Sequence, residues 1–236
     1  MPIFKIWKPV GLTPLEAIET LKEKEASLKE AKMTYAGRLD PLASGVLILL
    51  SGEDRFNKED YLKLPKTYEV EVLFGVSTDT GDVLGLIEKV SDSEVSLSKV
   101  EQVGPTFVGK KSQTAPKFSS PSLDGKNFTK EIEIYSINIK EGRALKSETV
   151  LKEVAEKISQ VAGNFRQASI EAKWQKVLKE KDSSLLVVKL EVVVSSGTYM
   201  RVLASQIGEA LGVPALAYSI TRLKVGDFTR QDCLDL

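Results

Sequence analysis

The chain has 236 residues, of which 42% are hydrophobic, and its 33 lysines and arginines balance 33 aspartates and glutamates. This length supports one large domain or two small ones, and the neutral net charge argues against a strongly basic surface but leaves room for a local basic groove. The sequence has no histidine and a single cysteine, Cys233. These counts exclude Ser-His-Asp and Cys-His catalysis, the HExxH zinc site and an internal disulfide. Carboxylates, tyrosines, lysines and arginines must therefore carry any chemistry.

The first fifty residues are predicted to form a strand, a turn, a helix and a buried strand. Residues 3–7 have strand character, and Pro14 opens a segment whose apolar residues recur at helical spacing. Asp40 precedes a proline, which is the chemistry of a helix start, so an N-cap is the commonplace interpretation of this residue. Residues 46–50 form a short apolar run of the kind found in buried strands.

A hairpin is predicted to follow. Apolar and charged side chains alternate over residues 68–74, which indicates a half-buried strand. The segment STDTGDVLG is rich in turn residues and leads into a second strand over residues 86–90. Asp79 and Asp82 in this turn resemble a paired acid/base site, but turn carboxylates are far commoner than catalytic pairs, so we assign them no catalytic role.

Residues 104–130 differ in character from the rest of the chain. They contain few aliphatic residues, many serines and five lysines, namely Lys110, Lys111, Lys117, Lys126 and Lys130. The composition predicts a loop. Lysines interleaved with phenylalanines suit a nucleic-acid surface, and a solvated surface loop explains the composition equally well.

The remaining segments predict a sheet with helices. Residues 131–139 alternate, residues 150–161 have a helical pattern, and residues 185–195 form the strongest predicted strand. SSGTYMRVLASQIGEALG turns into a helix, and residues 222–228 resemble a closing strand. Long strands mixed with helices, without strict alternation, predict an α+β fold around a largely antiparallel sheet, within one domain spanning residues 1–236.

Neither targeting nor membrane insertion is expected. The opening MPIFKIWKPVG is interrupted by charge too soon for a signal peptide, and no run approaches the roughly 18 apolar residues of a membrane span. A cytoplasmic protein is the resulting expectation.

Four motifs in order along the chain resemble those of the TruB family of tRNA pseudouridine synthases. AGRLDPLASGVLILLSGE resembles the family's catalytic motif, and KPVGLTP resembles its amino-terminal motif. KTYEVEVLFGVSTDTGDVLG resembles its Lys-x-Tyr strand with the turn that follows, and SSGTYMRVLASQIGEALG resembles its Gly-Thr-Tyr-Ile-Arg helix start. FVGKKSQTAPKFSS is a weaker fifth match, and together the matches extend from residue 8 to about residue 228.

The resemblance implies a fold and a reaction. The fold is a central, mostly antiparallel mixed sheet flanked by helices and loops. The reaction converts uridine 55 in the T-loop of tRNA to pseudouridine: the glycosidic bond breaks, the uracil rotates and carbon 5 forms the new bond. No redox change occurs and no atom is lost, so the resemblance implies neither a cofactor nor a metal. The base must be flipped out of the RNA to be reached.

The resemblance also implies three catalytic residues. Asp40 matches the nucleophile, and Arg201 matches the arginine that pairs with it. Burial alone disfavours an ionised carboxylate, so a buried cation beside it is physically necessary. Arg38 is nearer in sequence, but two residues along an extended loop point elsewhere, so we expect it on the RNA backbone or in solvent. Tyr68 matches the tyrosine that stacks on the base; its phenol suits proton removal from carbon 5, and stacking alone would also explain it.

Three further positions are expected to bind substrate. Tyr199 and Ile220 match residues that line the uracil pocket, and Tyr35 stands where the family has a histidine that fills the gap left by the flipped base. Two more departures lie in the lysine-rich segment, where Ser122 replaces a lysine and Thr129 replaces a tyrosine. We also expect no carboxy-terminal RNA-binding PUA domain, because about eight residues follow the last motif.

The expected partner is the T-arm of tRNA, bound by a monomer with no protein partner. A neutral net charge predicts modest, salt-sensitive RNA binding through a local patch. Two alternatives stay open: a synthase acting on ribosomal RNA, since GRLD also occurs there, and a non-catalytic chaperone that folds tRNA. A purely structural protein explains none of the four ordered motifs.

Overall fold

The computed structural model describes residues 3–116, 118, 128–179 and 184–236. The strands are β1 (Ile3–Lys8), β2 (Met33–Ala36), β3 (Ala43–Ser51), β4 (Lys66–Phe74), β5 (Val76–Thr78), β6 (Ile87–Val90), β7 (Gly109–Thr114), β8 (Thr129–Lys146), β9 (Ser184–Val194), β10 (Ala215–Val225) and β11 (Leu234–Asp235). The helices are α1 (Pro14–Lys24), α2 (Lys58–Lys63), α3 (Leu97–Val103), α4 (Ser147–Ser159), α5 (Gln167–Leu178) and α6 (Met200–Ala210). Short 3₁₀ helices occur at η1 (Ala26–Leu28), η2 (Gly52–Asn57), η3 (Gly104–Phe107) and η5 (Arg230–Asp232).

One sheet runs through the described part of the chain. Its nine strands have the order β11-β1-β3-β10-β4-β9-β8-β7, with β2 paired to β3. The pairs β1–β11 and β3–β10 are parallel, and the other pairs of this sheet are antiparallel. A separate hairpin joins β5 and β6. The predicted α+β class with a largely antiparallel sheet is confirmed.

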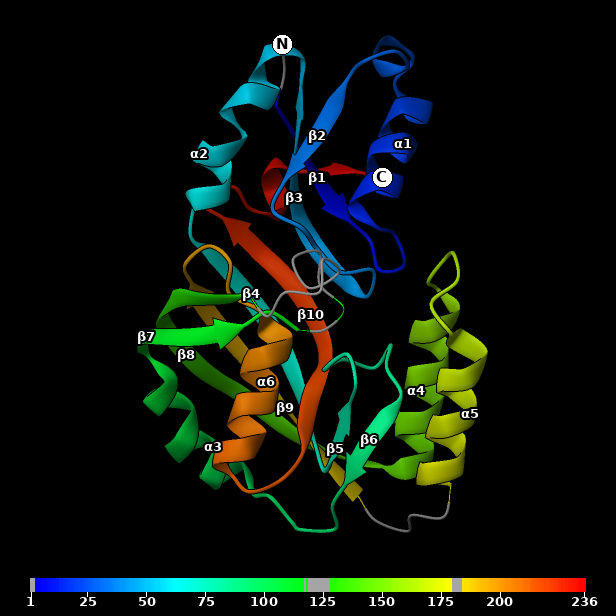
Figure 1. Cartoon of the computed structure of the whole chain (residues 1–236), viewed down its shortest axis with the longest axis vertical. Coiled ribbons are helices and arrows are strands. Elements are labelled where there is room, and N and C mark those ends of the chain that lie inside the picture. Colours follow the sequence, from blue (N-terminus) through cyan, green and yellow to red (C-terminus); the bar gives the residue numbers. More distant parts are fainter. Residues whose placement is uncertain (1–2, 117, 119–127, 180–183) are drawn as a thin grey trace.

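Helices cover both faces of the sheet in its lower half. Adjacent residues of a strand point to opposite faces, and the two core clusters follow this rule. Val72 of β4 lies in a cluster with α6, whereas its neighbour Leu73 lies in a cluster with α4 and α5. In Figure 1, α3 and α6 lie on one side and the α4–α5 pair on the other, while β1 to β3, α1, α2 and both termini form the upper half. The strand β10 extends from one half into the other.

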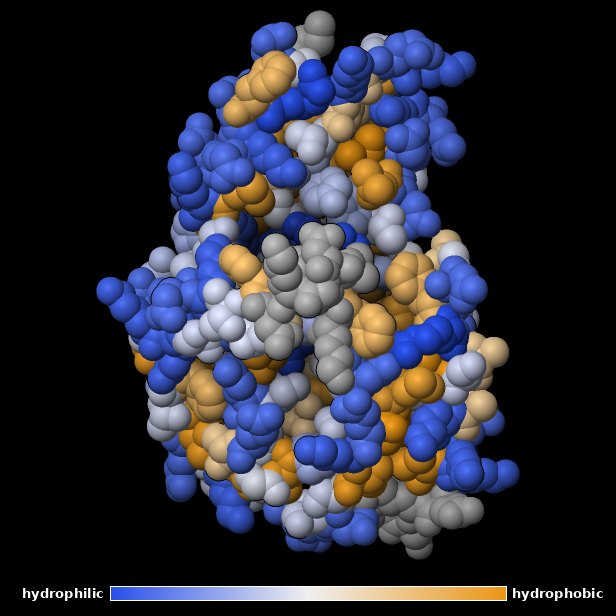
Figure 2. All heavy atoms as spheres, in the orientation of Figure 1, coloured by the Kyte–Doolittle hydropathy of each residue, from blue (hydrophilic) through white to orange (hydrophobic). Residues whose placement is uncertain are grey.

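The surface on this side of the molecule is largely hydrophilic. Figure 2 shows hydrophilic residues over most of this face, with apolar residues gathered between β6 and the α4–α5 pair. Within the described ranges, no helix has the length and apolar character needed to cross a membrane.

Most predicted elements are present with shifted ends. Residues 3–7 lie in β1, residues 46–50 in β3 and residues 68–74 in β4, and residues 86–90 contain β6. The predicted hairpin between residues 68–74 and 86–90 is wrong, because β6 pairs with β5, which overlaps the predicted turn, whereas β4 pairs with β9 and β10. The helix at Pro14 is α1, the helical pattern at 150–161 is α4, and the helix after SSGTY is α6. The helix α5 was not predicted, and the closing strand begins earlier, at the start of β10.

The helix-start interpretation of Asp40 is wrong. Asp40 lies in the turn between β2 and β3, and its carbonyl accepts a hydrogen bond from the Ala43 backbone N–H at 3.0 Å. The residues after it continue as a strand because β3 pairs with β1, β2 and β10. Pairing with three strands overrides a local helix-start signal.

The loop predicted over the lysine-rich residues 104–130 is also partly wrong. Gly109–Thr114 forms β7, which pairs with β8 so that Gln113 lies opposite Lys130. Lys110 and Lys111 therefore lie on a strand rather than in a loop. Lys117, Lys126 and Ser122 lie outside the described residues, whereas Thr129 is exposed and its hydroxyl contacts that of Thr114 at 3.0 Å.

The first helix supplies a test of local stability. The Thr13 hydroxyl accepts a hydrogen bond from the Glu16 N–H at 3.2 Å, and the Glu16 carboxylate accepts one from the Thr13 N–H at 2.7 Å. We expect Thr13→Ala to lower the free energy of unfolding by about 1 kcal/mol, measured by urea denaturation, because the helix loses its cap. Thr13→Ser keeps the oxygen and should be close to wild type; equal destabilisation by both would contradict this account.

Candidate active site

A cavity of about 700 Å³ opens near the middle of the molecule, and we call it the central cavity. Its walls come from the turn before β3, from α2, from the start of β4, from the segment between β9 and α6, and from β10. The sequence predicted six site residues, and all of them line this cavity: Tyr35, Asp40, Tyr68, Tyr199, Arg201 and Ile220. Segments far apart in the sequence therefore meet at the central cavity.

The Asp40 carboxylate faces the guanidinium of Arg201 within the cavity. Oδ2 of Asp40 lies 2.9 Å from Nε, and Oδ1 accepts a hydrogen bond from Nη2 at 3.4 Å. The contact at Nε is a charge contact, because this buried nitrogen has no hydrogen-bond partner among the described residues. The Arg201 side chain is 5% exposed, whereas 30% of the Asp40 side chain remains exposed. A buried cation thus holds a carboxylate that the cavity can still reach.

Three oxygen groups surround the guanidinium of Arg201. Besides Asp40, the Thr80 carbonyl accepts a hydrogen bond from Nη1 at 2.8 Å, and Oδ2 of Asp82 lies 3.8 Å from Nε. Burial alone would lower the pKa of Arg201, but the charges of Asp40 and Asp82 outweigh it and raise the pKa above its ordinary value. Arg201 therefore keeps its charge in a buried position.

The turn carboxylates have the structural role that the sequence indicated, with one addition. Asp79 accepts a hydrogen bond from the Leu86 N–H at 2.8 Å and pairs with Arg166 at 2.8 Å. Asp82 accepts hydrogen bonds from the Thr80 hydroxyl at 2.7 Å and the Leu84 N–H at 3.0 Å. Burial raises the pKa of Asp82. The addition is that Asp82 faces Arg201, which follows from tertiary packing and has no signal in the sequence.

A buried lysine ties the amino-terminal turn to the residue after Asp40. Nζ of Lys8 donates to the carbonyls of Leu12 at 2.6 Å and Pro41 at 3.4 Å. The Gly11 N–H donates to the same Pro41 carbonyl at 2.8 Å. Lys8 is fully buried, so these carbonyls replace its water. The KPVGLTP motif thereby supports the turn that carries Asp40.

A buried arginine supports the other side of that turn. Nε of Arg222 donates to the Val46 carbonyl at 2.7 Å, Nη1 to the Arg38 carbonyl at 3.3 Å and Nη2 to the Gly37 carbonyl at 3.2 Å. The backbone of β3 must approach Arg222 closely: a Cβ on Gly45, whose φ is +116°, would lie 2.2 Å from the Arg222 carbonyl oxygen. Sequence reasoning missed Lys8 and Arg222. The available signals were that Lys8 opens the KPVGLTP motif and that Arg222 begins the predicted closing strand.

The residues predicted to hold the base line the cavity from different elements. Tyr68 lies on β4, is 9% exposed and is paired in register with Arg222 of β10. Ile220 lies on β10, opposite Ala43 of β3. Tyr199 immediately precedes α6. A base entering the cavity would meet β4, β10 and the start of α6 together.

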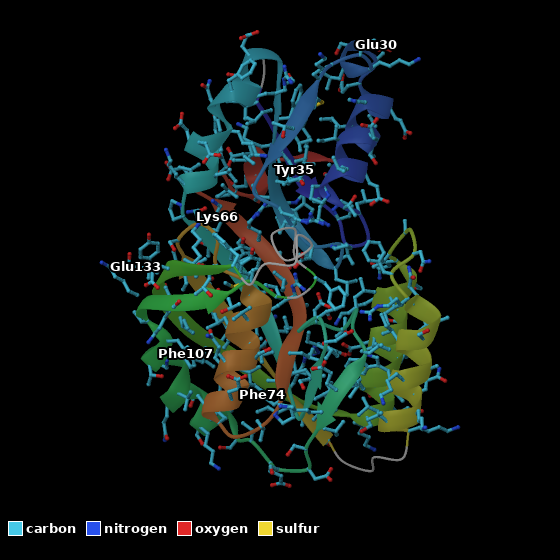
Figure 3. All side chains as sticks on the ribbon, in the orientation of Figure 1. Glu30, Tyr35, Lys66, Phe74, Phe107 and Glu133 are labelled. Atoms are coloured by element: carbon cyan, nitrogen blue, oxygen red, sulfur yellow. The ribbon has the colours of Figure 1, made fainter. Side chains whose placement is uncertain are left out.

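The cavity rim is basic. Nζ of Lys58 lies 5.4 Å from the ring centroid of Tyr35, and Lys66 donates to backbone carbonyls at the end of α2. Figure 3 shows Tyr35 in the upper half of the molecule and Lys66 below it, nearer the middle of the long axis. The exposed Arg38 lines the cavity, as do Lys63 and Lys130. In the described part of the chain, no group of three metal-ligating side chains occurs.

The chain is similar in sequence to known proteins along most of its length. Residues 24–139 match the TruB family pseudouridylate synthase (N terminal domain). A tRNA pseudouridine synthase B from Aquifex aeolicus is 30% identical over 229 residues, which cover 97% of this chain and 70% of the relative. One from Parabacteroides distasonis is 29% identical over 232 residues, covering 96% of this chain and 86% of the relative.

The fold has a solved counterpart. A chain in the crystal structure of a Cbf5-Nop10-Gar1 complex superposes with a TM-score of 0.65 at 22% identity, covering 99% of this chain and 52% of that chain. The fold and the sequence matches together define an enzyme of the isomerase class that makes pseudouridine. Within that class, the chain belongs to the TruB family of pseudouridylate synthases. The roles of the individual site residues stay predictions.

The buried lysine provides a pH-dependent test. Burial lowers the pKa of Lys8 from 10.5 to about 7. Between these values the unfolded chain binds more protons at this residue than the folded chain, so the free energy of unfolding should rise with pH, by at most about 1.4 kcal/mol per unit from this group. Urea denaturation at pH 7, 8 and 9 should show a smaller rise for Lys8→Met than for wild type.

The exposed Lys24 on α1 supplies the matched control. Lys24→Met should keep the wild-type pH slope, since that side chain stays in water. Burial also lowers the pKa of Lys66, to about 8, and its contribution is present in every variant and cancels from the differences. An unchanged slope in Lys8→Met would refute the account of this buried lysine.

Proposed function

We propose that this enzyme isomerises uridine 55 in the T-loop of tRNA to pseudouridine, with Asp40 as the nucleophile. The observation that carries the proposal is the accessible Asp40 carboxylate held by the buried Arg201 in a cavity that Tyr68 also lines. The curated relatives from Aquifex aeolicus and Parabacteroides distasonis bear the name tRNA pseudouridine synthase B, which supports tRNA as the substrate.

The proposed chemistry needs only groups of this chain and the uridine. The Asp40 carboxylate attacks carbon 1 of the sugar, so that a bond to Asp40 forms while the bond to N1 breaks and the uracil leaves with that electron pair. Arg201 lies against the carboxylate and orients it for the attack. The uracil rotates between the Tyr68 ring and Ile220, with Tyr199 at its edge. Carbon 5 then attacks the same sugar carbon, the bond to Asp40 breaks and the carboxylate is regenerated. The proton on carbon 5 leaves and N1 gains one, so atoms and electrons balance.

RNA recognition would use the basic rim of the central cavity. Arg38, Lys58, Lys63 and Lys130 line it and suit phosphate contacts, which carry most of the salt dependence of binding. The uridine must leave its stack, at a cost of a few kcal/mol, and Tyr35 would fill the space it vacates. Residues 1–236 would act as one catalytic domain, which the sheet shared by both halves supports. The proposed enzyme is a cytoplasmic monomer.

The nucleophile is tested by mapping pseudouridine on an unmodified tRNA transcript without added metal or nucleotide. We expect wild type to modify the T-loop uridine and Asp40→Asn to reduce the rate at least about 100-fold, because an amide is not a nucleophile here. The exposed Asp92 gives a matched control, and Asp92→Asn should retain full activity. Product on ribosomal RNA alone would replace the tRNA assignment, and no product on either would leave the folding chaperone.

The arginine is tested by a change that keeps its charge. Arg201→Lys cannot reach both Asp40 and the Thr80 carbonyl, which the guanidinium contacts through separate nitrogens. We expect kcat to fall about 100-fold while tRNA binding, measured by filter retention, stays near wild type. Wild-type kcat in Arg201→Lys would show that a positive charge alone suffices and that the separate contacts of the guanidinium nitrogens are not needed.

A further inference from the structure

We propose that Gln113 is a positioning residue that holds Tyr199, and through it Arg201, in place for the reaction. This inference rests on the proposed function. Gln113 lies on β7, an edge strand of the sheet, yet it is only 1% exposed. Gln113 is absent from the lining of the central cavity, so it acts through other residues rather than on the base.

The Gln113 amide makes a two-way contact with a single residue. Its Oε1 accepts a hydrogen bond from the Tyr199 N–H at 2.9 Å, and its Nε2 donates to the Tyr199 carbonyl at 3.4 Å. Nε2 also lies 3.4 Å from Oε1 of Gln206 on α6. A primary amide offers a donor and an acceptor side by side, as a backbone peptide does. Gln113 thus clamps the Tyr199 backbone as a neighbouring strand would.

Tyr199 lies at the start of α6, the helix that carries Arg201. Tyr199 is the N-cap of α6, and no side chain caps that helix end. Its carbonyl also accepts the first helical hydrogen bond, from the Leu203 N–H at 3.1 Å. Arg201 lies two residues further on, so a shift of the Tyr199 peptide moves the guanidinium away from Asp40. A misplacement of about 1 Å is enough to cost about 100-fold in rate.

The same hairpin holds the segment before α6 at further points. Nζ of Lys130 donates to the Ser196 carbonyl at 3.1 Å. The Glu133 N–H donates to the Ser195 hydroxyl at 2.8 Å, and the Ser195 N–H donates to the Glu133 carbonyl at 2.8 Å. Glu133 is labelled in Figure 3 beside β7 and β8. The β7–β8 hairpin therefore supports residues 195–199 along their length, and Gln113 supplies the contact nearest to Arg201.

A near-isosteric variant separates positioning from packing. In Gln113→Glu, burial at this 1% exposed position should raise the pKa of the new carboxyl above the ordinary glutamate value, so that it stays protonated at pH 5.5. The protonated side chain can still accept from the Tyr199 N–H and donate to its carbonyl, whereas the ionised side chain has no donor. We expect kcat near wild type at pH 5.5 and a loss of at least about ten-fold by pH 8.5, relative to wild type at each pH, with KM for tRNA within two-fold. Gln113→Leu should lose kcat equally at both pH values. Gln102→Glu, at an exposed position on α3, is the matched control and should follow wild type.

Hydrogen exchange supplies a readout that needs no substrate. The Tyr199 amide should exchange faster in Gln113→Leu than in wild type, and in Gln113→Glu the increase should appear only at the higher pH, with thermal melts confirming that each variant folds. These exchange changes test the clamp even if wild type modifies no RNA, which would refute the proposed function alone. A loss in Gln113→Glu that does not vary with pH, a rise in KM with kcat unchanged, or wild-type exchange at Tyr199 would each overturn the positioning role.

Discussion

The ion pair between Asp40 and Arg201 is the constraint on which the rest of the structure depends. A guanidinium that is 5% exposed is stable only when oxygens replace the water it has lost, and here Asp40, the Thr80 carbonyl and Asp82 do so. The pair joins the turn before β3 to the first turn of α6, two segments that share no strand pairing. Because Asp40 is 30% exposed, the pair leaves a charged oxygen facing the cavity rather than sealing it in the core.

Buried basic side chains also shape the backbone around that pair. Lys8 and Arg222 donate to carbonyls on either side of Asp40, and Lys66 donates to carbonyls at the end of α2. The carbonyls of Pro41 and Gly37 lie in a turn and that of Leu62 at the end of a helix, where regular backbone hydrogen bonds are scarce. Lys8 and Arg222 therefore hold the turn on both sides of Asp40, which explains how an irregular segment can keep a carboxylate in a defined place.

The edge hairpin β7–β8 links the outer surface to the same site. Its contacts with residues 195–199 run through Gln113, Lys130 and Glu133, and the first two of these lie opposite each other in the strand pairing. The cavity rim carries Arg38, Lys58, Lys63 and Lys130 on a chain whose total charge is zero. A local patch of this kind is consistent with RNA binding by a neutral protein.

The sequence by itself determined the class of fold, the family and the six residues that line the cavity, because strand alternation and ordered motifs such as GRLDPLASGVL and GTYMR are local patterns. Local patterns alone wrongly suggested a helix start at Asp40 and a loop at residues 109–114, because β3 and β7 owe their conformation to neighbouring strands distant in the chain. Only the tertiary structure decided that Asp82 faces Arg201, that Lys8 and Arg222 hold the Asp40 turn, and that Gln113 clamps Tyr199. Each of these contacts joins residues far apart in sequence, and packing of the sheet against its helices is what brings them within hydrogen-bond distance.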